Sequence, residues 1–137
     1  MNPIRNIWEK ANVNSDNRST TAGPLDILEE QANAINSCSE ETNIGSVVIS
    51  YSITVDDVLE EFRHVLYLFP EHAPDYEYQL IEVASKCENE FPVAVWAFHN
   101  TIVRIGKCKS EEAFYVALSK IFNDKRLGNV FDELQNV

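Results

Sequence analysis

The feature that most constrains the fold of this 137-residue chain is a run of apolar residues that begins after Thr54 and ends at Pro70. Within it, a continuous apolar stripe is formed by Val55, Val58, Leu59, Phe62, Val65, Leu66 and Phe69. Spacings of three and four residues place these side chains on one face of an α-helix. Thr54 and Asp57 fit a capping pair at the start, and proline is a common helix terminator. The pattern therefore predicts an amphipathic helix over residues 54–69.

The same spacing predicts further helices along the chain. Proline is favoured at the first position of a helix. Ser110 is a good N-cap, and two acidic residues follow it in the first turn. A short helix is expected after Gly128 at the C-terminal end. The other expected helices cover residues 3–11, 24–35, 74–89 and 110–122.

Residues 46–53 give the clearest β signal. They are rich in β-branched residues, and Ile49, Tyr51 and Ile53 alternate with serines. This alternation predicts a strand, or an extended lead-in to the next helix.

Residues 92–106 fit two structures. As a helix, the segment begins at Pro92 and ends at Gly106. As a hairpin, it turns at His99-Asn100, which is a weak turn sequence. The helix is therefore preferred, and the hairpin remains the alternative.

These elements predict a mainly α fold, an irregular bundle of six or seven helices. A small β element at 46–53, with or without 93–105, is compatible with it, and an α+β fold is the alternative. Residues 1–137 are expected to form one domain, with a flexible polar segment at about 12–23.

No sequence pattern indicates a catalytic or cofactor site. The four glycines form no phosphate-binding loop, and neither C-x-x-C nor H-E-x-x-H occurs. We therefore expect no enzyme activity, no cofactor and no metal. His64 is expected on an exposed helix face beside Glu60 and Glu61. Cys108 lies between two lysines, which could lower the pKa of its thiol.

The protein is expected to be cytoplasmic. Its three cysteines form no disulfide framework, and no apolar stretch approaches the roughly 20 residues that cross a bilayer. The N-terminus also lacks an apolar signal core.

The net charge of −11 is concentrated in the middle of the sequence. Residues 46–91 contain ten acidic and two basic residues. If two antiparallel helices carry these acids, they form one negative surface flanked by tyrosines, which are favoured at interfaces. The predicted partner-binding residues are Asp56, Asp57, Glu60, Glu61, Asp75, Glu77, Tyr78 and Glu82.

An acidic surface without catalytic chemistry favours binding of a basic protein. Nucleases are often basic because they bind phosphates, so an immunity protein or antitoxin that blocks a nuclease toxin is the leading hypothesis. Direct binding of nucleic acid or of an anionic membrane is disfavoured by the charge. The alternatives are a helical adaptor or regulatory subunit with an apolar groove, and a small enzyme with an unrecognised site. The oligomeric state is left open.

Overall fold

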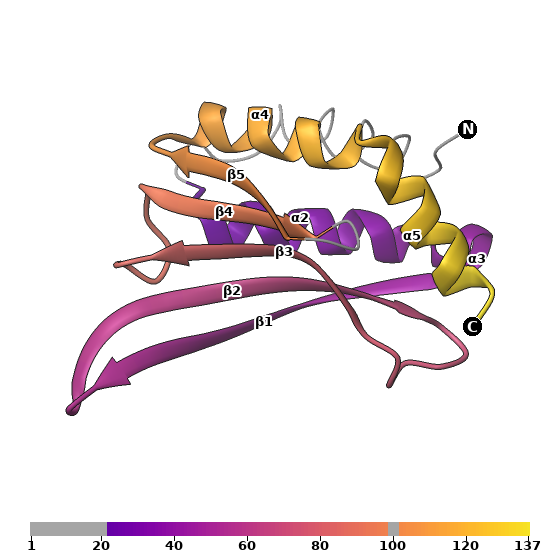
Figure 1. Cartoon of the computed structure of the whole chain (residues 1–137), viewed down its shortest axis with the longest axis horizontal. Coiled ribbons are helices and arrows are strands. Elements are labelled where there is room, and N and C mark those ends of the chain that lie inside the picture. The colour runs from indigo at the N-terminus through magenta and orange to yellow at the C-terminus, as the bar shows by residue number, and fades with distance from the viewer. Residues whose placement is uncertain (1–21, 99–101) are drawn as a thin grey trace.

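The computed structural model describes residues 22–98 and 102–137. They form a five-stranded antiparallel sheet whose strands follow one another in chain order, with four helices (Figure 1). The helices are α2 (Pro24–Ser37), α3 (Ser39–Thr42), α4 (Glu111–Phe122) and α5 (Lys125–Gln135). The strands are β1 (Ile44–Val55), β2 (Val58–Pro70), β3 (Tyr78–Ser85), β4 (Val93–Phe98) and β5 (Ile102–Cys108).

The hydrophobic core lies between one face of the sheet and helices α2, α4 and α5. Apolar side chains of all three helices and of the strands form one buried cluster. Its largest members include Phe114, Phe122 and Phe131 from the two C-terminal helices. The chain therefore has an α+β architecture, and the predicted helical bundle is wrong.

The predicted helix over residues 54–69 is the main error. Asp56 and Asp57 have φ values of 53° and 63°, and Val55 pairs with Val58 across them. Two successive left-handed residues form the tight turn that matches the twist of a β-hairpin, and aspartate tolerates this conformation. The chain therefore reverses at the two aspartates, and β2 pairs back along β1.

The apolar run fits a strand because β2 lies inside the sheet. It pairs with β1 along one edge and with β3 along the other, and successive side chains of a strand point to opposite faces of the sheet. His64, Val65 and Leu66 are consecutive and all buried. A strand buried on both faces is apolar at successive positions, and such a run also satisfies helical spacing.

The predicted helix over 74–89 is also wrong, since the segment contains strand β3 and no helix. The segment 92–106 is the hairpin β4–β5, so the preferred helix is wrong and the alternative is confirmed. Gly106, at φ 128°, lies where the β4–β5 register shifts, which is the signature of a β-bulge. The proposed His99-Asn100 turn lies outside the described residues.

Several sequence predictions are confirmed. The strand predicted at 46–53 is part of β1. Helices begin at Pro24 and after Ser110, as expected. The Oγ of Ser110 accepts a hydrogen bond from the Ala113 amide at 3.2 Å. The last helix starts at Lys125, three residues before the expected Gly128. The expected helix at 3–11 lies outside the described residues, as does nearly all of the segment 12–23.

Candidate functional site: the hairpin arm

The β1–β2 hairpin extends past the rest of the sheet (Figure 1). Strand β3 pairs with β2 only from Phe62 onward, so residues 58–61 of β2 pair with β1 alone. We call residues 53–60 the hairpin arm. Every residue of the arm from Thr54 to Glu60 is exposed.

The arm displays large apolar side chains. The exposed fractions of Val55, Val58 and Leu59 are 49%, 62% and 49%. A two-stranded ribbon has no second layer in which to bury them. Exposed apolar residues gathered on one projecting element are typical of an interaction site.

Three carboxylates stand beside these apolar residues. Asp56, Asp57 and Glu60 are exposed, and no lysine or arginine occurs between Ala22 and Arg63 in the sequence. Arg63 itself contacts other acids: its guanidinium lies 2.8 Å from Glu61 and 3.2 Å from Glu82. The end of the arm is therefore a concentrated negative charge next to an apolar surface.

Glu61 and Glu82 belong to a different cluster, on the face of the sheet away from the core. Arg63 binds both carboxylates and also lies over the ring of Trp96, 5.4 Å from its centroid. The hydroxyl of Tyr51 donates to Glu82 at 3.0 Å. Partial burial, followed by this hydrogen bond and the charge of Glu82, raises the pKa of Tyr51. These two acids share one internal cation, Arg63.

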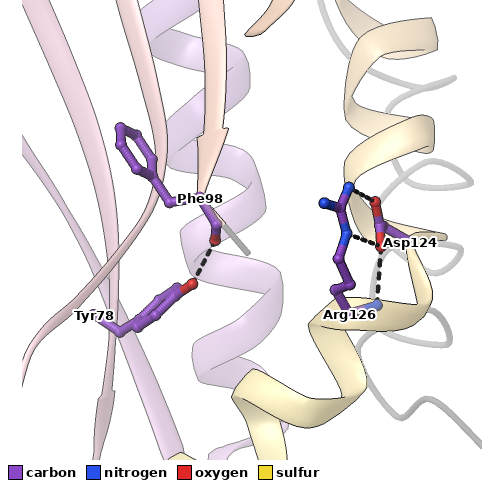
Figure 2. A network of polar contacts seen from close by, with 4 residues as sticks. All are labelled: Tyr78, Phe98, Asp124 and Arg126. Carbon is purple, nitrogen blue, oxygen red and sulfur yellow. Dashed lines mark hydrogen bonds and ion pairs between the residues drawn. The ribbon is translucent and has the colours of Figure 1, made fainter. Parts of the chain in front are cut away.

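Asp75, Glu77 and Tyr78 lie at the opposite end of β2. Asp75 and Glu77 are exposed in the connection to β3. At roughly 3.3 Å per residue, β2 separates them from the arm's tip by about 40 Å. Tyr78 is half-buried, and its hydroxyl donates to the Phe98 carbonyl at 2.6 Å (Figure 2). The predicted single acidic face is therefore divided among three places, and the arm is the one where three exposed acids lie beside Val55, Val58 and Leu59.

His64 is buried, contrary to the sequence prediction. Its side chain is 1% exposed, and both ring nitrogens are hydrogen-bonded. Nε2 lies 2.6 Å from the Glu88 carbonyl, which can only accept, so Nε2 carries the proton. Nδ1 then accepts from the Ser50 hydroxyl at 2.7 Å. A serine hydroxyl hydrogen-bonded to a histidine nitrogen is also the arrangement of a catalytic nucleophile and its general base. Here the burial of the imidazole favours a structural role.

Cys108 also differs from its prediction. Burial raises the pKa of its thiol, and the charge of Lys120 opposes this only in part. Its Sγ lies 3.7 Å from the Ala113 carbonyl. The flanking lysines therefore do not produce the lowered pKa that a nucleophilic cysteine needs.

Other candidate sites in the described part of the chain are small or lack ligands. A cleft of about 220 Å³ beside Ser85, Cys87 and Lys107 is below the roughly 300 Å³ at which ligand pockets usually begin. Within residues 22–98 and 102–137, no three His, Cys, Asp or Glu side chains are grouped to hold a metal ion. All three cysteines are free.

The sequence indicates the arm's carboxylates as a binding surface but not its apolar residues, because their spacing predicts a helix face that packs on the core. The signal that could have found them is the Asp56-Asp57 pair, since two turn-forming residues between apolar runs fit a hairpin. No protein-family model, curated protein or solved structure matches the chain. Among the helices that the structure describes, none is long and apolar enough to cross a membrane.

Proposed function

We propose that this protein is a non-catalytic binding protein that engages a basic protein through the hairpin arm. The observation that carries the proposal is that exposed Val55, Val58 and Leu59 lie beside three carboxylates whose nearest basic residue in the sequence, Arg63, contacts other acids. Apolar residues supply the buried area of an interface, while surrounding charges steer the encounter and select the partner. A basic partner would neutralise the arm and cover its apolar side chains together.

The specific form that we propose is an immunity protein or antitoxin that acts on a nuclease toxin in the cytoplasm. Nucleases present positive surfaces to phosphates, and an acidic arm can occupy such a surface and exclude the substrate. The net charge of −11 supports this form, since it also accelerates association with a basic protein. Asp75 and Glu77 could add long-range attraction from the far end of β2.

The test is isolation of the full-length protein with its partner from the native cell, followed by calorimetric titration over a series of salt concentrations. Replacing both turn aspartates by asparagine (Asp56→Asn with Asp57→Asn) removes charge but keeps a side chain that tolerates positive φ. We expect weaker binding and a smaller salt dependence. The matched control, Asp75→Asn with Glu77→Gln, removes the same charge about 40 Å away and should have a smaller effect.

Equal effects of the two double variants would show that only total charge matters, and the arm would then not be the binding site. The same would follow if neither pair changed the affinity.

A second candidate is an adaptor or regulatory subunit whose partner is apolar. The 62% exposure of Val58 favours it, although the predicted helical groove is replaced by a β-hairpin. Under this function, Val58→Ser with Leu59→Ser abolishes binding, and affinity changes little with salt. The affinity for a basic partner instead falls as the salt concentration rises, so one titration series distinguishes the two functions.

A further inference from the structure

Strand β1 lies at an edge of the sheet and contains no charged residue. Among the described strands it pairs only with β2 (Figure 1). Its twelve residues are Ile, Gly, Ser, Val, Val, Ile, Ser, Tyr, Ser, Ile, Thr and Val. A long, uncharged edge strand is a template for pairing with another strand, and proteins that must avoid this place lysine, proline or a bulge there.

The other edge of the sheet shows such protection. Strand β5 has seven residues, including Arg104 and Lys107, and Gly106 lies at the irregularity in its pairing with β4. Charges and a bulge both oppose pairing with a further strand. Strand β1 contains neither a charged residue nor a proline, although helix α2 lies beside it from Ser46 to Val48.

The hydrogen-bond pattern identifies which groups of β1 face outward. The Glu71 amide donates to the Asn43 carbonyl, and the next pair joins Ile44 to Pro70, which has no N–H to give. In an antiparallel ladder, pairs that bond each other alternate with pairs that do not. The backbone groups of residues 44, 46, 48, 50 and 52 therefore point away from β2.

This outward row is closed at one end. At Ser46 the side-chain amide of Asn36 accepts from the main-chain N–H at 2.7 Å and donates to the C=O at 2.9 Å. At the other end, the β1–β2 register shifts between Ile53 and Thr54, and the strand continues into the hairpin arm. Between these two points, the residues with outward N–H and C=O groups are Val48, Ser50 and Ser52, which we call the free edge.

We propose that the free edge pairs with the free edge of a second copy of this chain, in antiparallel orientation about a two-fold axis at Ser50. The free edge is symmetric about that residue, so Val48 of each copy lies opposite Ser52 of the other and every N–H of the free edge meets a C=O. On the opposite face of the strand, Ile49 of each copy lies beside Tyr51 of the other, and both are exposed in the single chain. Two chains of charge −11 can approach here because β1 brings no charge to the contact.

The oligomeric state tests this directly, by sedimentation of the full chain over a concentration series. We expect a species of twice the 15.6 kDa chain mass, and stronger association at higher salt because salt screens the repulsion between acidic copies. Ser52→Pro removes an outward N–H without affecting the bonds to β2, and proline is tolerated at such edge positions. It should weaken the dimer by about thirtyfold, the effect of two lost main-chain hydrogen bonds.

Two controls separate this effect from misfolding. Ser52→Ala keeps the backbone donor, and Arg104→Ala changes the other edge, so both should remain dimers. In the unaltered protein, amide exchange at Val48, Ser50 and Ser52 should be slow at high concentration and fast on dilution. A monomer at every concentration overturns the proposal, as does a dimer in which these three amides exchange freely. Binding of a basic partner weakens with salt, so the two proposals can fail independently.

Discussion

His64 is the residue whose environment departs furthest from its sequence context. It lies three residues after Glu61 in an acidic segment, yet it is buried with both ring nitrogens occupied. Strand pairing places it beside Ser50 of β1 and under the β3–β4 connection, whose Glu88 carbonyl it contacts. Its chemistry therefore depends on the fold and not on its neighbours in sequence.

Replacing His64 by alanine should lower the free energy of unfolding by about 2 kcal/mol, through the cavity and the two lost hydrogen bonds. His72, which is exposed in the β2–β3 connection, is the matched control, and His72→Ala should change stability by under about 0.5 kcal/mol. Urea unfolding measures both. Equal losses would contradict a structural role specific to His64.

Cys108 gives a pH-dependent prediction. Because burial raises the folded pKa of its thiol above the reference value of 9.0, the unfolded chain loses the proton first as pH rises. The stability from this group is complete below pH 9.0 and is lost as pH rises through the folded value. The unfolding midpoint should thus fall more steeply above pH 9.0 in the native protein than in Cys108→Ala.

At the scale of elements, backbone conformation distinguishes two glycines that have the same free space. A Cβ at Gly106 or at Gly128 would meet no atom within 4 Å. Gly106 has φ 128°, which L-residues rarely adopt, whereas Gly128 lies within helix α5. The bulge in β5 therefore requires glycine, and the helix does not.

Gly106→Ala should destabilise the protein by about 1–3 kcal/mol through backbone strain. Gly128→Ala should stabilise it by about 0.5–1 kcal/mol, since alanine favours the helix. Thermal unfolding of the two variants tests the pair. A stabilised Gly106→Ala would show that the β5 bulge is not required.

The helix termini were easier to predict because their signals are local. Ser110 caps α4 as expected. Helix α5 begins before the expected Gly128, at the cap Asp124, whose carboxylate accepts from the Arg126 amide at 2.9 Å and binds the same arginine's guanidinium (Figure 2). A cap acts within three residues of its own position, so sequence alone can reveal it.

For the whole molecule, the separation of charge has an energetic consequence. Nine acidic residues and no basic ones occur from Ala22 to Phe62, which covers α2, α3, β1 and the arm. Like charges on neighbouring elements repel in the folded state, and salt screens them.

Added sodium chloride should therefore raise the melting temperature. The rise should be smaller for Asp56→Asn with Asp57→Asn, which removes two of these charges. Differential scanning calorimetry at several salt concentrations checks both statements, and a melting temperature that falls with salt would contradict them.

The sequence by itself determined the elements whose signals are local: α2 after its proline, α4 behind its cap, and the alternation that marks β1. It also located the excess charge, including the carboxylates of the arm. Only the tertiary structure decided that the run from Val55 to Phe69 turns back at Asp56-Asp57 as a strand. A strand covered on both faces is apolar at consecutive positions, and such a run fits helical spacing equally well. Pairing partners distant in the sequence settle the choice, and they leave the ends of two strands exposed as the arm.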